Sequence, residues 1–186
     1  MNPKIPIPKN EGRDSITVKK VNTKKGFVFD DVKPGKTIVL KEDADFTLDV
    51  IRYTAKSKGQ KKKYYKAKIQ VHFCKGFCTD GATTANIPII NKVLPPYKQK
   101  DNVYNAAPFI HDGLYMKTGK IDGATLSKEE CDDILRGIWR ESKEVGRLLA
   151  AAADIMIELF AGSDAHWKYD KSENCKRFSA KITYLD

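Results

Sequence analysis

Residues 67–73 read Ala67-Lys68-Ile69-Gln70-Val71-His72-Phe73, a strict alternation of apolar and polar side chains. Because successive side chains of a strand point to opposite faces of a sheet, this period predicts a strand with one buried face. The same alternation runs from Phe46 through Leu48 to Val50, and turn-forming residues around Gly59 separate the two segments. We therefore expect a long central hairpin formed by residues 46–53 and 64–73.

The chain before this hairpin is also predicted to be extended. Three shorter segments are rich in β-branched and aromatic residues, which favours strands: Ile16–Val18, Phe27–Phe29 and Thr37–Leu40. Residues 15–73 are therefore predicted to be mainly β. Residues 1–14 contain three prolines and are predicted to be an extended tail that a partner could order.

Helical signals follow a connector rich in Gly and Pro, residues 74–100. Asp101-Asn102 is a suitable N-cap for a helix over 103–116, in which Pro108 allows a kink or a later start. The run Ser127-Lys128-Glu129-Glu130 matches a capping box, so a second helix should begin there. A third helix is expected over 145–160, which makes residues 101–162 the helical part of the chain.

Strands followed by helices predict an α+β fold with an N-terminal antiparallel sheet and about three helices. The length of 186 residues fits one domain, residues 15–186, whose C-terminal segment 163–186 could return as a strand. No apolar run is long enough for a transmembrane segment, and no signal peptide is recognisable at the N-terminus. The four cysteines are therefore expected to be reduced thiols.

The net charge of +10 is concentrated at one end of the chain. Residues 1–70 carry 18 Lys and Arg against 8 Asp and Glu, whereas residues 71–186 carry 16 of each. A strip of seven lysines with two tyrosines among them could contact nucleic acid or an anionic surface. The alternative is a charged hairpin tip that discourages strand pairing. The lysines are Lys56, Lys58, Lys61, Lys62, Lys63, Lys66 and Lys68.

The pair His111-Asp112 lies in the first predicted helix, where adjacent side chains point about 100° apart and are not expected to bond to each other. His111 can act as a general base, while Asp112 can face a second partner such as a metal ion. If the two helices pack antiparallel, Asp132 can reach the imidazole and fix its tautomer. The alternative is a structural pair at the edge of the core.

Cysteines and a glycine-rich segment supply further candidates. Between Gly76 and Thr83, Asp80 could bind a hard cation, although Asp-Gly is also a common turn signal. His72, Cys74 and Cys78 are a weaker candidate zinc site, because their spacing is not that of a standard finger. Cys131 could be a reactive thiolate, but its position on an apolar helix face favours a core residue.

Together these motifs resemble a family of largely phage-encoded proteins known as domain of unknown function 1353. The resemblance covers roughly residues 70–165 and departs from the family pattern at Thr83, for the usual Ser, and at Asp133, for the usual Arg. Arg136 or Arg140 could substitute for that basic residue. The resemblance implies a phage or prophage origin and a location in the host cytoplasm or the virion. The matching residues are Gly76, Thr79, Asp80, Gly81, Pro88, His111, Asp112, Leu114, Tyr115 and Asp132.

Two short strings, 111–115 and 131–135, are also similar to the active-site helices of secreted phospholipases A2. This likeness implies that His111 activates water, that Asp132 orients it, and that Asp112 helps to bind a divalent cation, with calcium the first choice. Asp80 is the second metal ligand that we expect. Gly76, Thr79, Gly81, Thr83 and Tyr115 complete the expected site. The disulfides that accompany these strings in phospholipases are absent here, so the likeness is local.

Three functions remain open at this stage. The first is a hydrolase, metal-assisted or not, that acts on an ester or amide of the cell envelope. The second is a virion or assembly protein in which the His-Asp pair is structural and phage structural proteins are the partners. The third is a host-directed factor that binds a host protein or an anionic group through the lysine strip.

Overall fold

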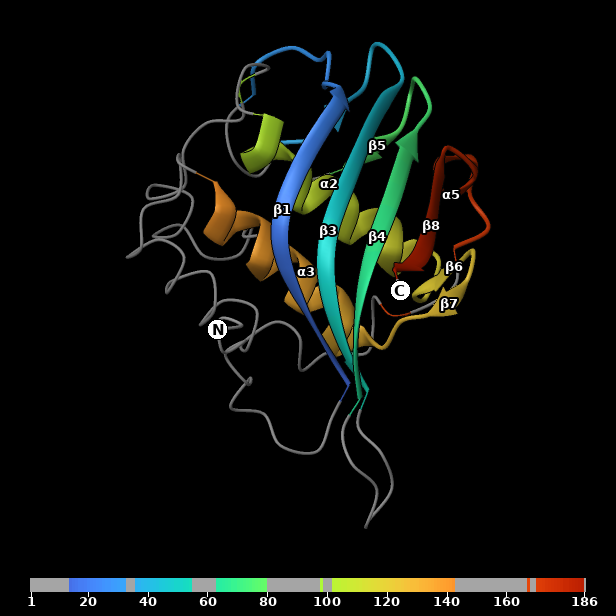
Figure 1. The fold of residues 1–186 in the computed structure, drawn as a ribbon. Helices are drawn as coiled ribbons and strands as arrows, with labels where there is room; N and C mark the ends of the chain where they lie inside the picture. The colour runs from blue at the N-terminus through green and yellow to red at the C-terminus, as the bar shows by residue number, and fades with distance from the viewer. Residues whose placement is uncertain are drawn as a thin grey trace, which may run out of the picture.

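The computed structural model describes residues 14–32, 36–54, 63–79, 98, 102–142, 167 and 170–185. Its largest element is a four-stranded antiparallel sheet in the order β1-β3-β4-β8, which confirms the predicted α+β class (Figure 1). The sheet strands are β1 (Ser15–Lys25), β3 (Ala44–Thr54), β4 (Lys63–Phe73) and β8 (Phe178–Leu185). The helices are α2 (Asn102–Met116), α3 (Lys128–Glu141) and the short α5 (Glu173–Lys176).

The central hairpin forms as the alternation predicts. β3 and β4 pair over their whole length, with Leu48 opposite Ile69 and Phe46 opposite Val71. On β4 the apolar residues of the alternation are buried, whereas Lys66 and Lys68 are exposed on the other face. Burial of one face therefore excludes a slip of one residue, which would expose every apolar side chain.

The segments around this hairpin differ in part from prediction. Phe27–Phe29 was expected to be a strand, but it lies outside any strand with both rings buried. β1 continues instead to Lys25 through two register shifts. Only Ile38–Val39 (β2) of the expected third strand pairs, with the short β5 (Cys78–Thr79). Packing of the phenylalanine rings overrides the local β preference: Phe27 stacks 4.3 Å from Phe109, between ring centroids.

Helices α2 and α3 cover the inner face of the sheet and lie behind it in Figure 1. α2 includes Pro108 in its interior, so the later start that a proline allows is not used. α3 begins at the predicted capping box: Ser127 Oγ accepts from the Glu130 backbone N–H, and the Glu130 carboxylate accepts from the Ser127 N–H. The predicted C-terminal strand is β8. The helix expected over 145–160 and residues 1–13 of the expected tail 1–14 lie outside the described residues.

Gly113 allows α2 to approach β8 closely. A Cβ placed at this position would lie 2.3 Å from the ring of Phe178, which is buried. We expect Gly113→Ala to reduce the free energy of unfolding by about 1–3 kcal/mol, since overpacking outweighs the better helix propensity of alanine. Urea unfolding measures this change. Adding Phe178→Leu should recover part of the loss; purely additive losses would contradict the steric explanation.

Candidate functional site

The first turns of α3 and the C-terminal half of α2 bring four polar side chains together. His111, Asp112 and Tyr115 come from α2, and Asp132 comes from α3. The hairpin of β6 (Lys120–Ile121) and β7 (Ala124–Thr125) connects the two helices. Gly119 adopts a φ of 68° at its start, a conformation that glycine tolerates without strain. The short connection holds α2 and α3 side by side, so His111 and Asp132, which are 21 positions apart, are in contact.

Asp132 binds both aromatic side chains through one oxygen. His111 Nε2 lies 3.0 Å from Asp132 Oδ1, and the Tyr115 hydroxyl donates to the same oxygen at 2.5 Å. The rings of His111 and Tyr115 are 4.0 Å apart between centroids, and Tyr115 meets Trp167 edge to face. Because an ionised carboxylate only accepts, a neutral His111 must carry its proton on Nε2. Its Nδ1 then has a free lone pair.

Asp112 lies on the Nδ1 side of His111. Its Oδ1 is 3.6 Å from Nδ1, close enough for electrostatic attraction and too far for a direct hydrogen bond. The two adjacent side chains thus lie close together without a direct hydrogen bond between them. Asp112 Oδ2 accepts a short hydrogen bond from the hydroxyl of Thr79.

Thr79 reaches Asp112 because α5 holds β5 in place. The Cys78 N–H donates to Asn174 Oδ1 at 2.8 Å, and Asn174 Nδ2 donates back to the Cys78 carbonyl at 2.8 Å. This pair of bonds fixes the backbone next to Thr79, which is buried. Asn174, near the C-terminus, therefore positions the Thr79 hydroxyl that bonds to Asp112 on α2.

Two carboxylates determine the charge of His111. Burial alone would lower its pKa, but attraction to Asp112 and the hydrogen bond to Asp132 outweigh burial and raise the pKa above its ordinary value. Burial and the bond to Asp132 raise the pKa of Tyr115, so this phenol stays protonated. The imidazole therefore shares a small site with one orienting carboxylate, one phenol and a second carboxylate.

Comparison with known families supports the resemblance seen in the motifs. A family model described as "Protein of unknown function (DUF1353)" matches residues 59–152, half of the chain. The chain belongs to this family. No curated protein and no solved structure matches it. Membership in DUF1353 covers both helices of the site, whereas the likeness to phospholipases A2 stays a separate hypothesis.

Other predicted site residues of this DUF1353 protein fall in different places. Asp80, Gly81 and Thr83 lie outside the described residues, as do Lys56, Lys58, Lys61 and Lys62. Gly76 lies in a turn and has a φ of 83°. The Arg177 side chain covers this glycine, and a Cβ added there would lie 3.2 Å from Arg177 Nε. Lys63, Lys66 and Lys68 are exposed along β4. These three lysines of the strip therefore belong to the sheet and not to the helices that carry His111 and Asp132.

The structure also tests the candidate thiolate Cys131 and the candidate zinc site. Burial, with nearby carboxylates, raises the pKa of the Cys131 thiol well above its usual range, so Cys131 is a core residue and not a thiolate. Within the described ranges, no group of three His, Cys, Asp or Glu residues could hold a metal ion. His72, Cys74 and Cys78, the weaker candidate for a zinc site, are therefore not such a group.

Asp133 has a structural role that the sequence did not suggest. Its Oδ2 accepts from the Ile16 backbone N–H at 3.3 Å, and Arg136 binds its Oδ1 at 3.2 Å. The aspartate therefore ties α3 to the edge strand β1. Across the part of the chain that the structure describes, no helix is long and apolar enough to span a bilayer.

Proposed function

We propose that this protein is a hydrolase in which His111 acts as general base on an ester or amide of the cell envelope. The observation that carries this proposal is the 3.0 Å contact between His111 Nε2 and Asp132 Oδ1, which leaves Nδ1 to accept a proton. Asp132 is the orienting carboxylate, as in other sites where a base is held by a third group. The local likeness to the phospholipase A2 helices supports the same assignment of roles.

The reaction that we propose uses a water molecule held by His111. Nδ1 removes a proton from the water as its oxygen attacks the carbonyl carbon, and Asp132 stabilises the imidazolium that forms. Collapse of the tetrahedral intermediate transfers this proton to the departing alcohol or amine. Asp112, whose Oδ1 is 3.6 Å from Nδ1, is placed to accept a hydrogen bond from the same water.

A divalent cation is the second part of the proposal. Asp112, together with Asp80, would hold it, and calcium is the ion that we favour. When bound, such an ion would polarise the substrate carbonyl. A metal that binds only the native protein must also raise its stability. Calcium should therefore raise the melting temperature of the wild type and leave that of Asp112→Asn unchanged, whereas no shift with any divalent ion would remove the metal from the proposal.

The test of the hydrolase is release of fatty acid from vesicles of phosphatidylglycerol and phosphatidylethanolamine, and of peptide from purified peptidoglycan. His111→Gln should reduce the rate at least about 100-fold, because general base catalysis typically contributes 10²- to 10⁴-fold. Circular dichroism must show that the variant is folded. Equal rates for wild type and His111→Gln on every substrate cleaved would refute a base role for His111.

The alternative is a binding protein of the phage particle or of the host cell. The exposure of Lys63, Lys66 and Lys68 along β4 favours it, because lysines aligned on a strand present positive charge to an acidic partner. In this case phage structural proteins or a host protein would co-purify equally well with wild type and with His111→Gln. Loss of the partner in His111→Gln alone would speak against this alternative.

A further inference from the structure

A second set of catalytic-type side chains lies at the end of the sheet where β3 begins and β4 ends. Asp45 on β3 and His72 on β4 are directly opposite each other, and Cys74 follows β4. His72 Nδ1 lies 2.8 Å from Asp45 Oδ1, and the Cys74 thiol lies 3.5 Å from His72 Nε2. The three groups thus form a line from carboxylate through imidazole to thiol, and none of them belongs to the site of His111.

The hydrogen bonds determine which nitrogen of His72 can act as a base. Asp45 accepts from Nδ1–H, which leaves the lone pair of the neutral imidazole on Nε2. Nε2 is the nitrogen that faces the Cys74 thiol. A nucleophile, a base and an orienting carboxylate in this order are the arrangement that activates cysteine and serine in many unrelated folds.

The backbone holds Cys74 in a fixed position. Its N–H donates to the Arg177 carbonyl at 2.8 Å, and its carbonyl accepts from the Phe77 N–H at 3.1 Å. Next to it, the Lys75 N–H donates to Asp43 Oδ1 at 2.7 Å, and the Gly76 N–H donates to the Leu40 carbonyl at 2.8 Å. The turn is therefore preorganised, and the thiol does not depend on a mobile loop to meet His72.

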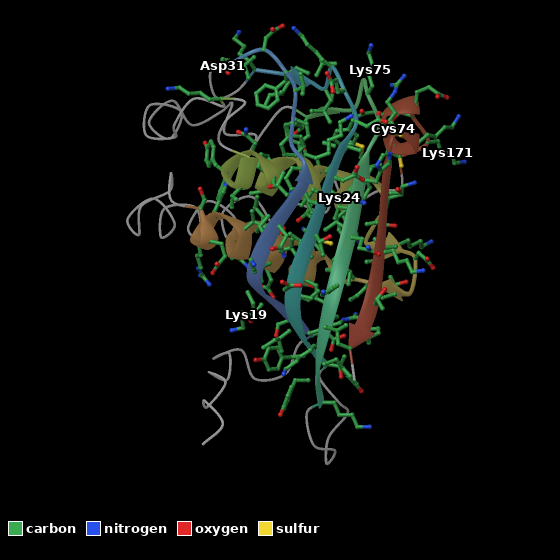
Figure 2. All side chains as sticks on the ribbon, turned by 45° about the horizontal axis from the view of Figure 1, so that its top comes forward. Lys19, Lys24, Asp31, Cys74, Lys75 and Lys171 are labelled. Carbon is green, nitrogen blue, oxygen red and sulfur yellow. The ribbon has the colours of Figure 1, made fainter. Side chains whose placement is uncertain are left out.

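The site is open to solvent, and a lysine and an arginine lie in the turn beside it. The side chains of His72 and Asp45 are 41% and 37% exposed, so a substrate can approach them. Lys75 is adjacent in sequence to Cys74, and both side chains are found at one end of the sheet (Figure 2). The Arg177 guanidinium covers Gly76 in the same turn.

We propose that Cys74, with His72 as base and Asp45 as positioning residue, is a second nucleophilic site that accepts an acyl group from an activated ester or thioester. The thiol proton passes to His72 Nε2 as sulfur forms a bond to the carbonyl carbon. The leaving oxygen or sulfur departs with its electron pair and takes that proton. Water then hydrolyses the Cys74 thioester, giving the free acid and the original thiol.

The experiment uses the full chain carrying His111→Gln, so that the first site does not consume the probe. p-Nitrophenyl acetate is added with a chelator, and peptide mass spectrometry follows acetylation of each cysteine with time and pH. We expect acetylation of Cys74 to be at least about 10-fold faster than that of Cys78, the matched half-buried cysteine of the same segment. In Cys74→Ser the fast phase of nitrophenol release should disappear.

Two further variants test whether His72 acts as the base and Asp45 as its positioning residue. His72→Gln should slow acetylation of Cys74 by about 100-fold or more, and Asp45→Asn should change the pH dependence of the remaining reaction. Both variants keep the strand residues polar and of similar size, and circular dichroism monitors their fold. Acetylation of Cys74 at an unchanged rate in His72→Gln, or no faster than Cys78 in the parent, would overturn the proposal.

Discussion

Arg52→Ala is expected to lower the free energy of unfolding by about 3–5 kcal/mol, because it would leave a buried carboxylate without its partner. Arg52 Nε and Nη2 lie 2.8 and 3.0 Å from the two oxygens of Glu130, whose side chain is fully buried. Arg52 also donates to the Tyr184 hydroxyl and the Thr125 carbonyl. Denaturant unfolding of wild type and variant measures the loss.

The raised pKa of Arg52 agrees with this view of the ion pair. Burial by itself lowers the pKa of the guanidinium, but its bonds to Glu130 and Tyr184 more than compensate. Arg52 therefore stays charged at every pH at which the protein folds. The pair connects β3 to the first turn of α3, and so it fixes the helix against the sheet.

Two control variants separate the ion pair from the helix cap that shares Glu130. Ser127→Ala removes one capping bond and leaves Arg52 in place, so it should cost only about 1 kcal/mol. The double change Arg52→Met and Glu130→Leu replaces both charges by apolar groups and should cost much less than Arg52→Ala alone. A double variant as unstable as the single one would show that the loss does not come from the unpaired charge of Glu130.

Local sequence patterns predict individual elements of this fold, but they do not predict the ion pair of Arg52 and Glu130. The alternation in β4 and the capping box at Ser127 are local patterns, and both predict their elements correctly. Arg52 and Glu130 are 78 residues apart, and each looks ordinary in its own segment. Only the packing of α3 on the sheet brings them together, so no local pattern contains the pair.

The two candidate sites differ in the same way. The contact of His111 with Asp132 could be expected because the capping box fixes the start of α3 and the short connection brings it next to α2. The contact of Thr79 with Asp112 depends on Asn174, 96 residues after Cys78. Asp45 and His72 meet only through the register of the hairpin, which the alternation alone does not specify.

Asp132→Asn is expected to reduce hydrolysis by about 10²- to 10⁴-fold, the usual contribution of an effective general base. A single oxygen of Asp132 accepts from both His111 and Tyr115, so the amide oxygen of asparagine can keep both bonds. The change therefore removes the negative charge that stabilises the imidazolium. Because the pKa of His111 is raised partly by Asp132, it should fall in the variant, and the pH at which activity is half-maximal should fall with it.

Titration of the His111 ring by NMR tests the effect of Asp132 on the pKa of His111 independently of any substrate. In the wild type its midpoint should lie above the ordinary value of about 6.5, and Asp132→Asn should lower it. Tyr115→Phe, which removes only the phenol, is the matched control and should move it little. A midpoint that does not change in Asp132→Asn would show that Asp132 does not act through His111.

The raised pKa of His111 also predicts how the free energy of unfolding depends on pH. A group whose pKa is higher in the folded than in the unfolded protein stabilises the fold by binding a proton. The contribution of His111 is complete below about pH 6.5 and is lost as the pH rises through the folded-state pKa. The stability of the wild type relative to Asp132→Asn should therefore decrease across this range. A base needs the neutral imidazole, so the pH range that favours catalysis is the one in which this stabilisation is lost.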